Sequence, residues 1–382
     1  MKIYRVGGAV RDALLGLPPG DTDWVVVGAT PERMVELGFT PVGRDFPVFL
    51  HPRTHEEYAL ARTERKTARG YRGFAFNCSP EVSLEDDLAR RDLTINAIAQ
   101  ADDGSLIDPY GGQRDIETRV LRHVGDAFAE DPVRILRLAR FAARFPEFSI
   151  APETMTLMRR MVDSGEVDAL VPERSWQEIA RGLMTARPSR MFAILRECGA
   201  LARILPELDS PAAGDGRGFA RALRAVDQAA AADASLEVRF ASLCSRIATE
   251  PAVAIEAIAA RLRVPNACRA LALLVAREYE AILVADALAP EALASLVARL
   301  DLIRRPDRLE PVLAAVRAGL AADRETDGEV DFPQADWLRR VSAAARSIDA
   351  GAIAATAGDP ARIPALVHEA RVAAIGGIEA GR

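Results

Sequence analysis

The spacing of apolar and polar positions divides the chain into two parts that meet near residue 125. Before that point, short runs rich in Val, Ile, Tyr and Phe end at Gly, Pro or Asp, which is typical of β-strands. Segments with helical spacing of apolar residues lie between these runs and end at glycine, which accommodates a left-handed helix cap. The expected elements are strands at 3–8, 23–28, 47–51 and 56–62 and helices at 9–16 and 31–38.

Beyond residue 125 the strand pattern disappears, and amphipathic helical segments follow one another with short polar joints. Since 382 residues exceed what one hydrophobic core normally organises, several domains are expected. We predict an α+β head at 1–125, with a small mixed β-sheet and helices. An all-α neck at 126–205 and an all-α body and tail at 206–382 would follow, with the clearest loop at 209–218.

Hydrophobic residues make up 49% and charged residues 27% of the chain, the profile of a soluble globular protein. No stretch approaches the roughly 18–20 uninterrupted apolar residues of a membrane span, and the charged N-terminus does not resemble a secretory signal. Four scattered cysteines without a C-x-x-C pair indicate reduced, buried thiols. These features predict a cytoplasmic protein with no membrane partner, and they leave the oligomeric state open.

The formal net charge is −6, which argues against a protein that coats nucleic acid non-specifically. Arginines nevertheless cluster at 62–72 and again at 134–144. Such clusters in an acidic chain suit a triphosphate or a phosphate backbone held at a defined place. The alternative is that arginine replaces lysine throughout, since only Lys2 and Lys66 occur.

A glycine pair, Gly7 and Gly8, separates the first expected strand from the first expected helix. Glycine permits close backbone approach, and the amides at the start of the following helix form an anion site. Arg11, one turn into that helix, could add a charge-assisted contact to the same phosphates. A simple turn is the alternative, so the pair indicates phosphate binding only together with the motif that follows it.

Asp21 and Asp23 lead directly into an apolar strand. In an extended chain, residues i and i+2 point the same way, with their backbones about 7 Å apart. That spacing suits two divalent cations bridged by carboxylates, as in in-line phosphoryl transfer, and Mg²⁺ is the expected metal. An Asp-rich turn before a strand is the alternative. A third carboxylate could come from Glu56, Glu57 or Glu64, which the sequence does not rank.

The order of glycine pair, helix and Asp-Thr-Asp resembles the signature of the DNA polymerase β-like nucleotidyltransferase superfamily, specifically of class II tRNA nucleotidyltransferases and bacterial poly(A) polymerases. The resemblance implies an enzyme that adds C, C and A to the 3′ end of tRNA from CTP and ATP and releases pyrophosphate. It also implies that Asp21 and Asp23 hold the catalytic Mg²⁺ ions and that Gly8 and Arg11 bind the nucleotide.

Two further segments follow in the order that the family shows. Segment 84–99 resembles its ribose-reading motif, which implies that Arg91 and Asp92 lie near the sugar 2′-hydroxyl. An arginine and a carboxylate can donate to and accept from one hydroxyl. An amphipathic helix with an exposed charged end is the alternative. Segment 107–124 resembles the hinge motif, with the glycine pair 111–112 as its flexible element.

Segment 129–145 resembles the nucleotide-selecting motif E-D-x-x-R. The resemblance implies that Asp131 accepts from the exocyclic amine of C or A, while Arg134 donates to the adjacent ring acceptors. Arg137 and Arg140 would meet the triphosphate or stiffen the site. The arginines of this segment share one face of a helical wheel, so a solvent-facing charged stripe is the alternative.

Other functions stay open at this point. Poly(A) polymerases typically carry G-[RK]-[RK]-F where this chain has Asp45 in place of the second basic residue, which favours a tRNA nucleotidyltransferase. The basic segment 59–74 matches a flexible loop that enzymes adding only two C residues lack, which favours full CCA addition over an A-adding or CC-adding specificity. A catalytically silent RNA-binding relative is disfavoured because the carboxylate, ribose and base motifs are intact.

The body resembles the C-terminal region of the multifunctional tRNA nucleotidyltransferases, clearly so at 238–248. Where those proteins carry an H-D pair for a metal-dependent phosphohydrolase, this chain has Ser245 and Arg246, and no histidine occurs between His123 and His368. Such a site needs imidazole ligands. We therefore expect the phosphohydrolase activity to be absent and the body to serve tRNA binding.

Overall fold

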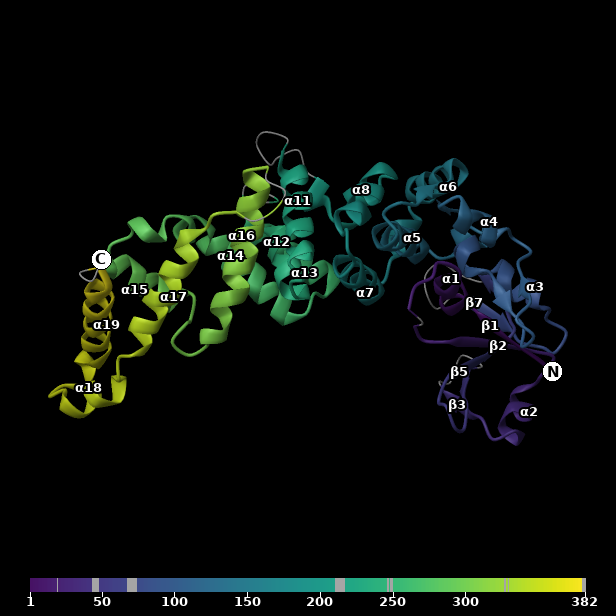
Figure 1. Ribbon diagram of the computed structural model, residues 1–382, viewed down its shortest axis with the longest axis horizontal. Coiled ribbons are helices and arrows are strands. Elements are labelled where there is room, and N and C mark those ends of the chain that lie inside the picture. The colour runs from purple at the N-terminus through teal and green to yellow at the C-terminus, as the bar shows by residue number, and fades with distance from the viewer. Residues whose placement is uncertain are drawn as a thin grey trace. The chain divides into compact units, whose positions relative to one another are not determined.

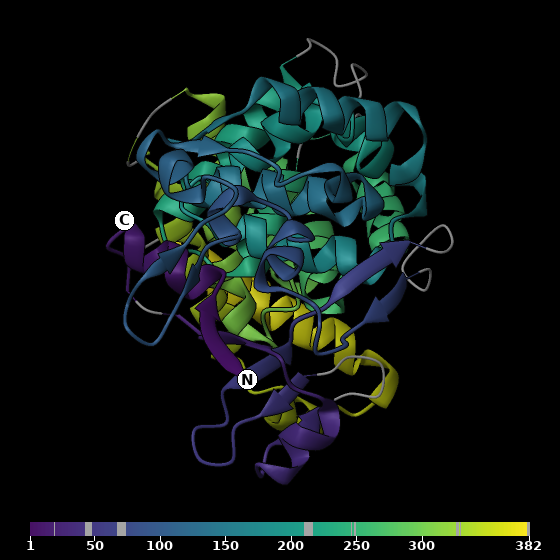
Figure 2. The same cartoon turned by 90° about the vertical axis from the view of Figure 1, so that its right-hand side faces the viewer.

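The computed structural model contains two compact units, Met1–Gly182 with Arg190–Ile204 and Leu183–Ser189 with Leu205–Arg382. Strands are confined to the purple-to-blue part of the chain, and the teal-to-yellow part is helical (Figure 1, Figure 2). The predicted α+β head followed by a helical remainder is thereby confirmed apart from one two-residue strand, β11 (Ser149–Ile150), and the division at residues 125 and 205 stays a prediction. The described residues are 1–18, 20–42, 48–66, 74–209, 217–245, 247, 250–325, 328 and 330–379.

Within the described residues, the main sheet of the first unit has seven strands in the order β3-β4-β5-β2-β1-β8-β9. β2 and β5 run parallel and the other neighbouring pairs are antiparallel, so the sheet is mixed, as expected. The sequence missed β3, β8 and β9, which are too short for an alternating pattern. The strands are β1 Lys2–Val6, β2 Asp23–Val27, β3 Thr40–Val42, β4 Val48–Leu50, β5 Glu57–Leu60, β8 Ala99–Gln100 and β9 Leu106–Ile107.

A separate antiparallel hairpin follows β5 and consists of β6 (Thr63–Lys66) and β7 (Phe74–Asn77). The sequence predicted a loop over 59–74, and the structure instead forms strand at both of its ends. A hairpin ladder is made by backbone groups, so a run of charged residues does not prevent it. The tip at 67–73 lies outside the described residues.

Helices of the first unit surround the sheet and continue beyond it. Both predicted early helices form, and each is followed by a glycine with positive φ, 68° at Gly16 and 86° at Gly38. The prediction that no strand occurs beyond residue 125 was wrong, because β11 (Ser149–Ile150) pairs with β10 (Val120–Leu121). Two residues are too few to show in a periodicity. The helices are α1 Gly8–Leu14, α2 Pro31–Glu36, α3 Leu84–Ala89, α4 Gly112–Glu117, α5 Val133–Arg144, α6 Pro152–Asp163, α7 Pro172–Leu183, α8 Ser189–Glu197 and α9 Leu201–Ile204.

Alternate residues of β2 enter two different hydrophobic cores. Val25 packs in a cluster with Leu88 of α3, whereas Val26 packs in a cluster with Met34 of α2. Because side chains alternate along a strand, Asp23 points to the same face of the sheet as Val25. The pleat therefore directs this carboxylate toward the side on which α3 lies.

The second unit is built from helices that pack in pairs, with α11 against α16, α12 against α14 and α17 against α19. Trp337 is buried, and its indole N–H donates to the carbonyl of Ala285 at 3.0 Å. No described helix has the length and apolarity to cross a bilayer. Most of the expected loop 209–218 lies outside the described residues. The helices are α10 Pro206–Asp209, α11 Gly218–Ala231, α12 Leu236–Cys244, α13 Pro251–Leu262, α14 Asn266–Leu283, α15 Pro290–Arg299, α16 Leu309–Asp323, α17 Pro333–Arg346, α18 Ala350–Thr356 and α19 Ile363–Glu379.

The glycine pair of the expected hinge is held by specific contacts. Gly111 has φ 73°, and the amide of Gly112 donates to Asp108 at 2.7 Å. A Cβ added at Gly112 would overlap the carbonyl oxygen of Thr94 and lie 2.7 Å from Ile98 Cγ1. Gly112 is therefore required for the close packing of α4 against the turn at residue 94.

We expect Gly112→Ala to lower the free energy of unfolding by about 3 kcal/mol, because a side chain is forced into a packed core. Gly111→Ala is the matched control. No atom lies near its added Cβ, so only the left-handed backbone opposes it, at a cost of about 1 kcal/mol. Urea unfolding of the two variants measures the difference, and equal losses would contradict the packing role of Gly112.

Candidate active site

The first unit contains a cleft of about 540 Å³ whose wall is dominated by arginine. Nine of its sixteen lining residues are arginines and three are aspartates. A cavity with this excess of positive charge suits a polyanion such as a triphosphate. The lining residues are Gly7, Gly8, Arg11, Asp23, Arg62, Arg90, Arg91, Asp92, Asn96, Asp131, Arg134, Arg137, Arg140, Phe141, Arg144 and Arg174.

The glycine pair between β1 and α1 lies at the edge of this cleft. Gly7 has φ 70°, and a Cβ added there would lie 2.9 Å from Arg91 Nη1. Residue 7 is therefore glycine for two reasons: its backbone has a positive φ, and the guanidinium of Arg91 approaches it closely. Gly8 begins α1 and lines the cleft, as expected for a backbone that meets phosphate.

Arg11 lines the cleft, but its guanidinium is already held by the protein. Its Nε donates to Asp12 at 2.8 Å, its Nη1 donates to Asn96 at 2.5 Å, and it stacks 5.0 Å from the ring of Phe141. Burial lowers the pKa of Arg11, and the charge of Asp12 opposes this. The sequence predicted a phosphate contact here, and the structure gives Arg11 a place in the wall behind such a contact.

The carboxylates of the Asp-Thr-Asp motif occupy different positions. Both residues keep exposed surface, but Asp23 lines the cleft and Asp21 does not. Burial raises the pKa of Asp23, Arg91 opposes this, and the nearby charge of Asp21 adds to it. Asp21 and Asp23 are therefore close enough to repel each other.

The sheet register separates the three candidates for a further carboxylate. Glu57 pairs with Asp23 across the parallel strands β5 and β2, and the two residues also line a smaller cavity of about 170 Å³. Glu56, the preceding residue, accepts instead from the hydroxyl of Thr54 at 2.8 Å. The side chain of Glu64 lies outside the described residues. Strand pairing thus favours Glu57, which the sequence could not rank.

The donors near Asp23 are carboxylate oxygens, which Mg²⁺ prefers. The described part of the chain contains no cluster of three or more His, Cys, Asp or Glu side chains arranged to hold a metal. Mg²⁺ commonly takes only one or two protein carboxylates and completes its shell with substrate phosphates and water. Two carboxylates, Asp23 with either Asp21 or Glu57, would fit that mode of binding.

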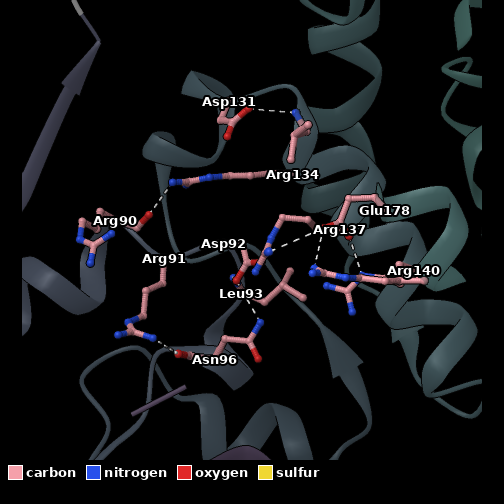
Figure 3. A network of polar contacts seen from close by, with 12 residues as sticks. Arg90, Arg91, Asp92, Leu93, Asn96, Asp131, Arg134, Arg137, Arg140 and Glu178 are labelled. Carbon is pink, nitrogen blue, oxygen red and sulfur yellow. Dashed lines mark hydrogen bonds and ion pairs between the residues drawn. The ribbon is translucent and has the colours of Figure 1, made fainter. Parts of the chain in front are cut away.

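The ribose-reading motif forms a rigid corner of the cleft (Figure 3). Asp92 accepts from Asn96 Nδ2 at 3.0 Å and from Arg137 Nε at 2.8 Å. Burial alone would raise the pKa of Asp92, but Arg137 and the bond from Asn96 outweigh it and hold this pKa well below its usual range. Arg91 donates to the carbonyl of Asn96 at 3.3 Å. The predicted pair Arg91 and Asp92 is thus brought together at one site.

The base-reading pair is also oriented by neighbours. Asp131 accepts two hydrogen bonds from Arg174, at 2.7 and 3.3 Å. Arg134 donates to the carbonyl of Ala127 at 2.9 Å. It also donates to the carbonyl of Arg90 at 2.6 Å (Figure 3). Both members of the pair line the cleft, and each is held by contacts with the protein.

Two residues of α7 complete the wall, and the sequence analysis missed both. Glu178 is buried and accepts from Arg140 Nε at 2.5 Å, while Arg137 Nη1 lies 3.9 Å from its other oxygen. Arg174 and Glu178 are four residues apart, so they share a helix face. This four-residue spacing of charged residues, near an arginine-rich helix, was the signal in the sequence that could have pointed to Arg174 and Glu178. The arginine face of α5 lines the cleft, which excludes the alternative of a purely solvent-facing stripe.

Comparison with known sequences gives similar proteins over the whole chain. A family model of the poly(A) polymerase head domain matches residues 3–122, and one for the probable RNA- and SrmB-binding site of polymerase A matches residues 147–210. A multifunctional CCA protein of Burkholderia mallei is 55% identical over 409 residues, covering 98% of each chain. A multifunctional CCA protein of Burkholderia multivorans is 54% identical with the same coverage.

Solved structures show the same likeness. The CCA-adding enzyme of Bacillus stearothermophilus in complex with CTP has a TM-score of 0.71 at 25% identity, covering 98% of this chain and 89% of that one. The Thermotoga maritima CCA-adding enzyme complexed with tRNA has a TM-score of 0.68 at 20% identity, covering 98% and 87%. At 20% identity, the likeness to the Thermotoga maritima enzyme shows a shared fold alone.

We expect Asp92→Asn to lower the free energy of unfolding by about 2–3 kcal/mol at pH 7, because it leaves the charge of Arg137 without its buried partner. The pKa of Asp92 is depressed by folding, so its stabilisation is present above the unfolded pKa of about 3.9 and is lost as pH falls through the folded value. The difference in unfolding free energy between Asp92→Asn and the unaltered protein should therefore be constant above about pH 5 and shrink below about pH 4.

Urea unfolding between pH 3.5 and pH 8 tests this expectation. Asp103→Asn removes an exposed carboxylate that accepts from the backbone N–H and the hydroxyl of Ser105, and it should change stability by less than about 0.5 kcal/mol. A deficit for Asp92→Asn that grows as the pH falls would contradict the assigned pKa direction.

Proposed function

The chain belongs to the class II tRNA nucleotidyltransferases, the family of the multifunctional CCA proteins, and we propose that its arginine-lined cleft adds C, C and A in turn to the 3′ end of tRNA. CTP and ATP are the donors and pyrophosphate is released, with no nucleic-acid template. The supporting observation is that one cleft collects Asp23, the ribose motif and the base-reading pair under a strong excess of positive charge.

Base selection rests on Asp131 and Arg134. A carboxylate accepts from the exocyclic amine of cytosine or adenine, and a guanidinium donates to the adjacent ring acceptors. Guanine and uracil present a carbonyl where that amine would be, so they leave the carboxylate without a donor. Arg174 holds Asp131 by two hydrogen bonds, which fixes the direction in which the acceptor faces.

The remaining cleft residues orient the ribose and the triphosphate. Arg91 and Asp92 can donate to and accept from the ribose 2′-hydroxyl. The turn at Gly8 brings backbone to the phosphates, with Arg11 supporting it from behind. Arg137 and Arg140 contribute charge from α5, and both are held by Glu178. Holding the donor in this way converts the reaction with the tRNA hydroxyl into a step between aligned groups.

Enzymes of this family are generally metal-dependent, and we propose that Mg²⁺ is held by Asp21 and Asp23 with Glu57 as the third carboxylate. When bound, Mg²⁺ lowers the pKa of the attacking hydroxyl and neutralises charge on the departing pyrophosphate. The carboxylates contribute the negative charge that attracts the ion, and the register of β2 with β5 places two of them side by side.

The proposal extends to the second unit and to the place where the protein works. We propose that the body and tail at 206–382 bind tRNA and that the protein works in the cytoplasm, where its buried free cysteines stay reduced. Asp45, which disfavours a poly(A) polymerase, lies outside the described residues, so this discrimination still rests on sequence. An A-adding or CC-adding enzyme is the alternative that an assay separates.

A 3′-extension assay with tRNA ending at the discriminator base tests the proposal. With CTP and ATP together, three nucleotides should be added; with CTP alone, two should be added. ATP incorporation only into tRNA ending in C-C would indicate an A-adding enzyme. Long A tails would indicate a poly(A) polymerase, and no incorporation in any combination would indicate a silent relative.

We expect Asp23→Asn to reduce nucleotide addition by at least about 100-fold, the scale seen when one group that stabilises transition-state charge is removed. Asp21→Asn and Glu57→Gln should also reduce it, whereas Asp103→Asn, at an exposed turn, should not. tRNA binding, measured by filter retention, should stay within about twofold of the unaltered protein, since the changes do not touch the body. Nucleotide addition at full rate by Asp23→Asn would refute the role of Asp23 in holding the metal.

We propose that the second unit has no phosphohydrolase activity, since the sequence has no histidine between His123 and His368. Ser245, at the place of the expected histidine, is buried, and its hydroxyl donates to the carbonyl of Ser242 at 3.2 Å. The alignment with the Burkholderia mallei protein spans 409 residues and this chain has 382, so that relative carries stretches without a counterpart here. We propose that this unit acts only as a scaffold for tRNA.

We expect no hydrolysis of 2′,3′-cyclic AMP or p-nitrophenyl phosphate in the presence of Ni²⁺ or Mg²⁺, because a site of this kind needs imidazole ligands. The same preparation should add CCA to tRNA, which shows that the protein is folded. Robust turnover that persists in Asp23→Asn would refute the proposal, since that variant removes the other candidate metal site.

A further inference from the structure

A buried carboxylate outside the expected motif residues lies behind the cleft. Asp87 of α3 has 0% of its surface exposed. It accepts from Arg90 Nη2 at 2.6 Å, from Arg91 Nη2 at 3.3 Å and from the backbone N–H of Arg62 at 3.3 Å. Burial would raise the pKa of Asp87, but the two arginines and these bonds outweigh it and lower this pKa. Because this ionised carboxylate is sealed from solvent, it does not bind substrate itself. Its role is to position other groups.

Asp87 and Arg90 together hold both backbone polar groups of Arg62. The N–H of Arg62 donates to Asp87, and its carbonyl accepts from Arg90 Nε at 3.1 Å. The same Arg90 Nε donates to Asp87 at 3.0 Å. Arg62 immediately precedes β6, so this clamp fixes the point at which the β6–β7 hairpin leaves the sheet.

The backbone of Arg90 connects the clamp to the base reader. Its carbonyl accepts from Arg134 Nη2 at 2.6 Å, across 44 residues of sequence (Figure 3). Arg134 Nη1 donates to the carbonyl of Ala127 at 2.9 Å. Two acceptors on a planar guanidinium define its orientation, so a displacement of Arg90 changes the direction in which Arg134 faces the cleft.

We propose that Asp87 is a positioning residue for nucleotide selection: by clamping Arg90 against Arg62, it sets the orientation in which Arg134 meets the incoming base. The inference rests on the proposed function, because it takes Arg134 as the base reader. Reading a base with two side chains requires their donors and acceptors at fixed spacing. A guanidinium that can turn also finds acceptors on uracil, so loss of the clamp relaxes the choice of C over U.

Asp87→Asn tests this inference, because it removes the charge at nearly constant shape. Glu85→Gln is the matched control, since it removes the same charge from an exposed position of the same helix. We measure kcat/KM for CTP and UTP with tRNA ending at the discriminator base. The CTP:UTP ratio should fall at least about tenfold in Asp87→Asn, the size of one charge-assisted hydrogen bond, and stay unchanged in Glu85→Gln. Lower activity with an unchanged ratio would mean a merely structural role and overturn the inference.

Arg90→Lys provides a second variant if Asp87→Asn fails to fold, as judged by circular dichroism. Lysine keeps the charge but cannot bridge Asp87 and the Arg62 carbonyl with the planar fork of arginine, so the ratio should fall here too. An unchanged ratio in folded Arg90→Lys would overturn the inference.

A double variant tests whether Asp87 acts through Arg134. In an Arg134→Ala background, Asp87→Asn should cause no further loss of the CTP:UTP ratio, because both changes affect one guanidinium. Additive losses would overturn the inference. Failure of the unaltered protein to incorporate CTP would overturn the proposed function itself, so the two failures are distinguishable.

Discussion

Nine guanidinium groups line one cleft, and their mutual repulsion is the constraint around which the first unit is organised. Bringing like charges into a partly buried space is costly unless each charge has a partner. The partners of seven of these arginines are carboxylates of neighbouring segments, most of them buried, and each contacts one or two of the arginines. They are Asp12, Asp87, Asp92, Asp131 and Glu178.

This arrangement explains how an acidic protein can hold a triphosphate. The carboxylates compensate only part of the charge, since nine arginines face three aspartates on the cleft wall itself. The remaining positive charge is available to the ligand, while the paired charges fix the side chains that carry it. The entropy of ordering long arginine side chains is thus lost during folding and need not be lost again when the nucleotide binds.

The sequence was informative where function depends on backbone periodicity and on neighbouring residues. The Asp-Thr-Asp motif before an apolar strand predicted a carboxylate at the site, and the helical spacing of α5 predicted a shared face for its arginines. Glu57 could not be ranked above Glu56 and Glu64, and Asp87 and Glu178 could not be found, because their roles come from strand register and from contacts between segments far apart in the chain. Neither kind of contact leaves a periodic signal. Gly112 is a related case, since packing against Thr94 is invisible in the sequence.

Selection of a base by protein alone demands that the reading groups be oriented before the base arrives. Arg134 is oriented by two backbone carbonyls and Asp131 by Arg174. A backbone carbonyl is a better reference than a mobile side chain, because its position is determined by the packing of the whole segment. Arg90 supplies one of these carbonyls while its own side chain is held by Asp87. Arg134, the corner at Arg91 and the start of the β6–β7 hairpin therefore share one buried anion, Asp87, so a shift at any of them must be accommodated by the others.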